Sequence, residues 1–156
     1  MGVEIERKFL VVGDDWRSAV SSSTRTVQGY LASTPEVTVR VRVRGERAYL
    51  TIKGRSSGIS RSEYEFDIPV ADAEAMLTDL AQGPVIEKTR HLLEVDGHTW
   101  ELDVFAGANE GLVMAEIELG SADEQFTVPS WAGRDVSDDA RYYNVNLART
   151  PYSHWA

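Results

Sequence analysis

The sequence predicts a mainly β domain (α+β) in which eight antiparallel strands close into a barrel around a polar tunnel, with a few short helices outside. Eight segments alternate apolar and polar residues with period two, whereas only three short segments have a helical pattern. Charged side chains fall on one face of these strands, so the opposite, apolar face must be buried. A closed barrel provides two such faces and leaves no strand edge unpaired. An interior of ionised groups then requires water, metal ions or a bound anion.

The clearest strand is Val-Thr-Val-Arg-Val-Arg-Val-Arg over residues 37–44. Its four valines take one face, while Thr38, Arg40, Arg42 and Arg44 take the other. The other predicted strands are 3–12, 24–33, 46–53, 61–69, 85–95, 98–105 and 113–120. Asp96-Gly97 is the strongest hairpin signal, because both residues tolerate a positive φ.

Three segments have a helical pattern: 14–21 after an aspartate, 71–81, and 137–149 with Ser137 as a possible cap. The middle segment is the strongest, since it contains helix formers, early acidic residues and a stop at Gly83-Pro84. The serine-rich stretch 18–23 is expected to be a loop. No internal repeat or linker is found, so a single domain over residues 1–156 is expected.

The chain has 156 residues, no cysteine, and a net charge of −9 from 16 basic and 25 acidic residues. The lack of cysteine excludes disulfides, zinc–thiolate sites and iron–sulfur clusters. The acidic balance disfavours nucleic acid and anionic membranes as partners. The sequence has no apolar run of membrane-spanning length, and its start, Met1 to Glu6, does not resemble a signal peptide, so a cytoplasmic location is expected. The sequence makes no prediction of oligomeric state.

Like charges recur at spacing i, i+2, which places them on one face of a strand about 6.5–7 Å apart. Such pairs mildly destabilise a sheet. A single charged strand face is usually just solvated. Like-charged pairs on six strands, however, favour a bound ligand that needs both positive and negative side chains. Clustered carboxylates favour Mg²⁺ or Mn²⁺, and clustered Arg and Lys favour phosphate oxygens. Together they predict metal-assisted phosphoryl chemistry, without a P-loop. The acidic pairs are Glu4/Glu6, Glu63/Glu65, Glu101/Asp103 and Glu116/Glu118, and the basic pairs are Arg40/Arg42 and Lys88/Arg90.

Glu4-Ile5-Glu6-Arg7-Lys8 resembles the Glu-x-Glu-x-Lys signature of the CYTH domain, or triphosphate tunnel metalloenzyme, family. The charged pairs follow it in the family's order, together with Thr51-Ile52-Lys53-Gly54. Arg141-Tyr142-Tyr143-Asn144 resembles the C-terminal Arg-Tyr-x-Asn element. The resemblance covers residues 4–144 and is greatest to the short bacterial inorganic triphosphatases.

The resemblance implies a role for each matching residue. The triphosphate would be bound by Lys8, Tyr30, Arg40, Arg42, Lys53, Lys88 and Arg90, although Tyr30 would also suit a structural core. One or two divalent cations, Mg²⁺ or Mn²⁺, would be held by Glu4, Glu6, Glu116 and Glu118, with Asp103 assisting. Glu63, Glu65 and Glu101 would line the tunnel. The catalytic set would be Glu4, Glu6, Lys8, Glu63 and Lys88.

The activity implied first is hydrolysis of inorganic tripolyphosphate to pyrophosphate and orthophosphate by metal-activated water. The alternatives are a class IV-type adenylate cyclase that makes cyclic AMP from ATP, a thiamine triphosphatase, and, less favoured, a non-catalytic binder of polyphosphate or nucleotide. The implied tunnel set has eight carboxylates and six bases, so most of the net charge of −9 lies elsewhere. A small polyanion that enters with its metal is therefore compatible with an acidic chain.

Overall fold

The computed structural model describes residues 2–155, which form nine strands and two α-helices. The strands are β1 (Gly2–Val11), β2 (Val20–Ser33), β3 (Val37–Arg44), β4 (Arg47–Gly54), β5 (Ser60–Ile68), β6 (Ile86–Val95), β7 (His98–Phe105), β8 (Val113–Glu118) and β9 (Ala132–Asp135). The helices are α1 (Val70–Asp79) and α2 (Asn144–Arg149). Short 3₁₀ turns cover Asp15–Ala19, Gly107–Asn109, Ala140–Tyr142 and Tyr152–His154. None of the helical segments described is long and apolar enough to cross a membrane.

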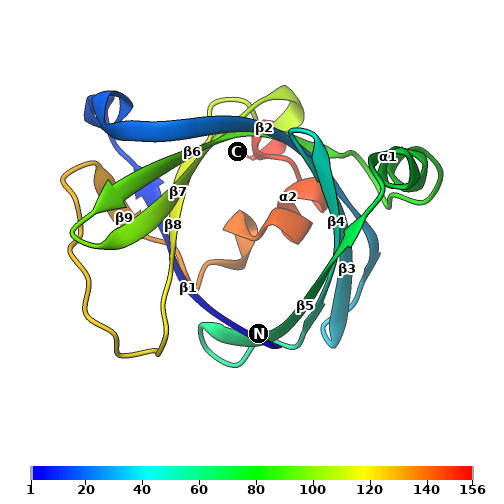
Figure 1. Ribbon diagram of the computed structural model, residues 1–156, viewed down its shortest axis with the longest axis horizontal. Coiled ribbons are helices and arrows are strands. Elements are labelled where there is room, and N and C mark those ends of the chain that lie inside the picture. The colour runs from blue at the N-terminus through cyan, green and yellow to red at the C-terminus, as the bar shows by residue number, and fades with distance from the viewer. Residues whose placement is uncertain (1, 156) are drawn as a thin grey trace.

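Strands β1 to β8 form a closed antiparallel barrel, which confirms the predicted fold (Figure 1). The order is β5-β4-β3-β2-β6-β7-β8-β1, and the first residues of β1 pair with β5 to close the ring. The second half of β1 pairs with β8, and the short strand β9 adds to the end of β1. The hairpin at Asp96-Gly97 forms as predicted, with φ values of 47° and 84°.

Three local predictions differ from the structure. The predicted helix 14–21 is only a 3₁₀ turn, because β2 already begins at Val20 and pairs with β6 from that residue onward. The predicted loop at 18–23 is therefore mostly strand. The predicted helix 137–149 is α-helical only from Asn144, after a 3₁₀ turn at Ala140–Tyr142. Strand β9 was not predicted, because its four residues show no alternation.

The apolar outer face of the barrel is covered over much of its circumference. Phe9, Trp100 and Trp131 are buried in one cluster, and α1 packs over β3 and β4 (Figure 1). Gly29 allows α1 to approach β2 closely, since a Cβ at this position would lie 2.9 Å from a Leu77 methyl carbon. Tyr64 and Phe66 on β5 are each 55% exposed, so the expectation that every apolar reverse face is buried is wrong for this strand.

The lumen face changes from charged to apolar toward one end. Strands β6, β7 and β8 carry Ile86, Phe105 and Met114 two residues beyond their last charged lumen residues, and these side chains are buried. Helix α2 packs against this apolar layer through Leu147 and Ala148. Figure 1 shows α2 and the segment before it within the outline of the ring. The C-terminal segment therefore borders the charged part of the lumen.

Candidate functional site

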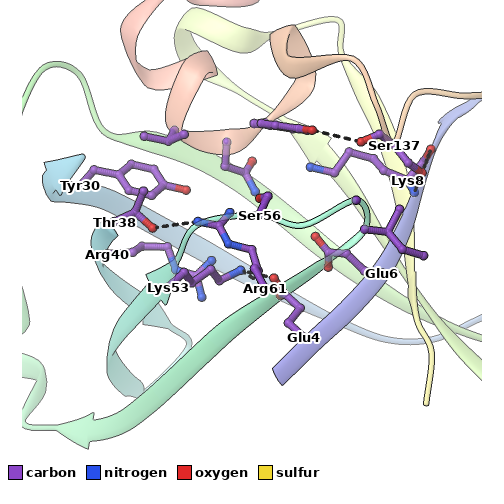
Figure 2. Close-up of a pocket in the computed structure, with 15 residues that line it drawn as sticks. Glu4, Glu6, Lys8, Tyr30, Thr38, Arg40, Lys53, Ser56, Arg61 and Ser137 are labelled. Atoms are coloured by element: carbon purple, nitrogen blue, oxygen red, sulfur yellow. Dashed lines mark hydrogen bonds and ion pairs between the residues drawn. The ribbon is translucent and has the colours of Figure 1, made fainter. Parts of the chain in front are cut away.

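Two cavities in the lumen share Glu4, Glu6, Arg40, Lys53 and Asn144 in their walls. The covered cavity, of about 80 Å³, is also bordered by the loop residues Ser56, Gly58 and Ile59 and by residues of the C-terminal segment (Figure 2). The acidic cavity, of about 150 Å³, is also bordered by Arg42, Arg44, Glu63, Glu65, Arg90, Glu101, Glu116 and Glu118. Alternate residues of a strand face the same way, so the period-two pattern brings these distant residues together.

Lys53 and Lys8 are held by acidic partners on opposite sides of the covered cavity. The Lys53 ammonium lies 2.8 Å from a carboxylate oxygen of Glu4 and 3.5 Å from one of Glu63. The Lys8 ammonium lies 3.6 Å from Glu116 and donates a hydrogen bond to the Tyr142 carbonyl. Both lysines are therefore in position to exchange these contacts for contacts with an anion bound in the cavity.

Arg40 and Arg42 on β3 are buried and have few acidic contacts. Arg42 donates to the amide oxygen of Gln28 at 2.8 Å and makes no ion pair among residues 2–155. Burial, followed by the charges of Arg40 and Arg90, lowers the pKa of Arg42 to about 9. Arg40 donates to the Thr51 hydroxyl and lies 3.7 Å from Glu65. Two neighbouring buried guanidinium groups with one distant carboxylate favour an anion beside them.

Lys88, Arg90 and Asp103 form a buried cluster in the wall of the lumen. Arg90 donates two hydrogen bonds of 2.8 Å to the two oxygens of Asp103, and the Lys88 ammonium lies 2.6 Å from that carboxylate. Burial, with the charges of Arg90 and Arg42, lowers the pKa of Lys88 to about 7 despite Asp103. Lys88 does not border either cavity. Asp103 is thus a counter-ion of two bases, and both of its oxygens are already engaged.

Glu6 and Glu116 are the carboxylates best suited to a divalent cation. Burial and then the charges of Glu116 and Glu4 raise the pKa of Glu6 well above its ordinary value. Burial alone would also raise the pKa of Glu116, but the charges of Lys8 and Arg90 hold it well below the ordinary range. Opposite pKa shifts in two neighbouring carboxyl groups favour the sharing of one proton between them, and a hard cation can take the place of that proton.

The remaining acidic residues surround the acidic cavity. Burial and the neighbouring charge of Glu4 raise the pKa of both Glu63 and Glu118. Glu118 lies directly opposite Glu6 in the β1–β8 register and borders the same cavity, so it is placed as a further ligand for a cation at Glu6. Among residues 2–155, no three acidic or histidine side chains already form a ready metal cage. The donor set nevertheless fits a hard divalent ion, because it consists of several partly uncompensated carboxylates.

Several lining residues were not predicted from the sequence. Arg61, Thr38 and Asn144 all border the covered cavity, and Arg44 borders the acidic one. Alternation would have identified Arg61, since it shares a strand face with Glu63 and Glu65. Asn144 was singled out only within a C-terminal motif, and its side-chain oxygen is buried with no hydrogen-bond partner among residues 2–155. Tyr30 borders the covered cavity, as its predicted binding role requires.

The C-terminal segment is attached to β1 beside Lys8. The Lys8 amide donates to the Ser137 hydroxyl at 2.8 Å, and the Tyr143 hydroxyl donates to the Ser137 carbonyl. Figure 2 shows Ser137 next to Lys8, with Glu6 nearby on the same side of the cavity. The segment therefore holds Lys8 in place and borders the site, whereas the exposed Arg141 pairs with Asp139 outside it.

Comparisons with known proteins show the family of the chain. A model of the CYTH domain family matches residues 2–150. The chain is 48% identical over 155 residues to an inorganic triphosphatase of Acetivibrio thermocellus, covering 99% of both chains. It is 40% identical over 149 residues to an inorganic triphosphatase of Nitrosomonas europaea, covering 93% of this chain and 96% of that one.

Solved structures share the fold of this chain. A crystal structure of an inorganic triphosphatase is 38% identical, covers 95% of each chain and has a TM-score of 0.67. A putative adenylate cyclase from Bacillus halodurans is 16% identical, with a TM-score of 0.60 over 79% of this chain and 84% of that one. The barrel is therefore common to proteins described by different activities, so the choice among activities depends on the residues inside it.

Proposed function

Because this chain belongs to the CYTH domain family, we propose that it is a hydrolase that cleaves inorganic tripolyphosphate to pyrophosphate and orthophosphate with a divalent cation. The two relatives named inorganic triphosphatase support this reaction, since each matches more than nine-tenths of the chain. The substrate is a small polyanion, and the proposal requires neither nucleic acid nor a membrane.

One observation carries the proposal: a single cavity of the lumen is lined both by the carboxylates of Glu6 and Glu116 and by the buried bases Arg40 and Arg42, which have few acidic partners. An isolated buried charge of either sign is costly. A metal–triphosphate complex supplies both missing counter-charges at once, because the cation meets the carboxylates and the phosphate oxygens meet the bases. A neutral organic substrate would leave both groups unpaired.

The bases of the lumen bind and orient the phosphate chain in this proposal. Arg40 and Arg42 offer fork-shaped donors from β3, and Lys8 and Lys53 offer point charges from opposite sides of the covered cavity. Positive groups already in place stabilise the charge that develops on the departing pyrophosphate. No side chain needs to form a covalent intermediate. Lys88 is buried against Asp103, so we propose for it a supporting electrostatic role.

The divalent cation, Mg²⁺ or Mn²⁺, would be held by Glu6 and Glu116, with Glu118 and Glu4 as further ligands. When bound, such an ion neutralises phosphate oxygens and makes water a better nucleophile. Glu4 must first exchange its contact with Lys53, whose ammonium lies 2.8 Å away. We leave Asp103 out of this set because Lys88 and Arg90 already engage it.

Orthophosphate release from tripolyphosphate, with and without Mg²⁺ or Mn²⁺, tests the proposal. We expect turnover only with metal, and a loss of about 100-fold or more in kcat for Glu6→Ala. Glu46→Ala, an exposed change in the β3–β4 turn, is the matched control and is expected to behave as wild type. Equal rates with and without metal would refute the proposal.

A substrate panel separates the alternatives. ATP, thiamine triphosphate and pyrophosphate are assayed beside tripolyphosphate, and cyclic AMP is measured with ATP. A higher kcat/KM for thiamine triphosphate, or cyclic AMP as the main product from ATP, would replace the proposed reaction by that activity. Tight binding of tripolyphosphate without turnover, with Mg²⁺, Mn²⁺ and Ca²⁺ alike, would indicate a binding protein.

A further inference from the structure

Arg61 at the start of β5 is a basic residue of the lumen that none of the charged-pair motifs includes. It lies opposite Glu4 in the β1–β5 register and borders the covered cavity together with Lys8, Lys53 and Arg40. Figure 2 shows Arg61 beside Arg40 and Lys53, with Lys8 on the other side of the cavity. The cavity is therefore surrounded by four basic side chains.

The guanidinium of Arg61 lacks an acidic partner. Its one side-chain hydrogen bond goes to the Thr38 hydroxyl at 3.4 Å, and its Nε is buried without a partner among residues 2–155. Glu4, the acidic residue directly opposite, has both oxygens engaged by Lys53. In contrast, the exposed Arg55 six residues earlier pairs with Glu36 at 2.6 Å. A buried donor without an acceptor is costly unless a ligand supplies one.

We propose that Arg61 is a substrate-binding residue that holds the end of the triphosphate chain lying in the covered cavity. This inference rests on the proposed function and adds a residue to its binding set. The fork of a guanidinium matches two phosphate oxygens, and the weak contact with Thr38 leaves the fork free to reorient. Because Arg61 borders the covered cavity and not the acidic one, it reaches one end of the substrate only.

The test compares Arg61→Gln, Arg61→Lys and the control Arg55→Gln, which removes the same charge from the exposed part of the same hairpin. We expect KM for tripolyphosphate to rise roughly 10- to 100-fold in R61Q, the loss of one charge-assisted phosphate contact, while kcat changes by less than about 3-fold. R61K keeps the charge but not the fork, so its KM should lie between those of R61Q and wild type. R55Q should match wild type.

Calorimetric binding of tripolyphosphate in EDTA, where metal-dependent turnover is prevented, gives an independent readout. We expect R61Q to bind at least about 10-fold more weakly than wild type, with R61K between them. Equal binding by R61Q and wild type would overturn the inference. It would also be overturned if R61Q and R61K lost kcat equally with unchanged KM, since that pattern indicates a structural role. A wild-type protein that binds tripolyphosphate through Arg61 but never cleaves it refutes only the proposed function.

Discussion

Lys53 on β4 donates hydrogen bonds of 2.9 and 2.8 Å to the two carboxylate oxygens of Glu4 on β1. The contact reaches across β5, which lies between these strands and closes the barrel. Lys53 also lies 3.5 Å from Glu63 on β5, so one ammonium connects three consecutive strands at the closure. The same pair links the expected metal ligands to the expected substrate ligands, because each partner belongs to one set.

Replacing Lys53 by Met should separate these two roles. The carboxylate of Glu4 loses its counter-ion, so Mn²⁺ should bind about 5-fold more tightly in the absence of substrate, about 1 kcal/mol. Tripolyphosphate should bind more weakly, because one cation has left the cavity. Isothermal titration measures both affinities, with Arg25→Met at a surface ion pair as control. Weaker Mn²⁺ binding in K53M would contradict this prediction.

The shared proton of Glu6 and Glu116 should appear in the pH dependence of stability without metal. The pKa of Glu6 is raised above 4.5, so the native state retains a proton that the unfolded chain releases. Stability should therefore fall as pH rises from 4.5 through the native pKa of Glu6, and Glu6→Gln should reduce this slope to the part that Glu63 and Glu118 contribute. The lowered pKa of Glu116 has the opposite sign and costs stability only as pH drops below 4.5.

Urea unfolding in EDTA, followed at several pH values from 4.5 to neutrality, measures this slope. Glu46→Gln, which changes an exposed carboxyl, should keep the wild-type slope. An E6Q protein with the wild-type slope would show that another group holds the proton.

Asp103→Asn should destabilise the protein by about 3–5 kcal/mol, the usual cost of breaking a buried ion pair. The change leaves the Lys88 ammonium, which has no exposed surface, and the buried Arg90 guanidinium without their shared carboxylate. Chemical denaturation gives the free energy of unfolding. The matched control, Asp67→Asn, removes an exposed partner of Arg47 and should cost less than about 1 kcal/mol. Similar costs for the two variants would mean that the buried cluster is not needed for stability.

The uncovered outer face of β5 predicts unequal costs for two aromatic substitutions. Phe66 is 55% exposed, so Phe66→Ala should cost less than about 1 kcal/mol. Trp100 is fully buried against Phe9 and Trp131, so Trp100→Ala should cost about 3–5 kcal/mol. Thermal unfolding of the two variants measures both losses of stability. A large loss of stability in F66A would mean that the outer face of β5 is covered in solution.

Much of the barrel could be predicted because alternation is a direct consequence of strand geometry. The segment 37–44 forms β3 with the predicted bounds, and the lumen residues Arg40 and Arg42 follow from its pattern. Strand β9 could not be predicted in this way, because four residues are too few to show a period and its pairing with β1 is a tertiary effect. The same holds for Val20, whose strand conformation is set by pairing with Leu93 on β6.

Alternation predicts which face a residue takes, but not how deep it lies along the barrel. Arg40 and Lys88 both face inward, yet Arg40 borders both cavities, whereas Lys88 is fully buried against Asp103 and borders neither. The stagger between strands sets that depth, and the sequence pattern of a single strand carries no information on it. Arg61, in contrast, was accessible from the pattern, since it takes the same face as Glu63.

The bond between Lys8 and Ser137 joins residues 129 positions apart and completes the wall of the covered cavity. During synthesis on the ribosome, β1 is made well before its partner β8 and the segment around Ser137. The first residues of β1, Gly2 to Ile5, can pair with β5 early, whereas the second half of β1 stays unpaired until β8 has been made. We expect closure of the barrel to be a late and slow step of folding, because it depends on contacts between residues far apart in the sequence.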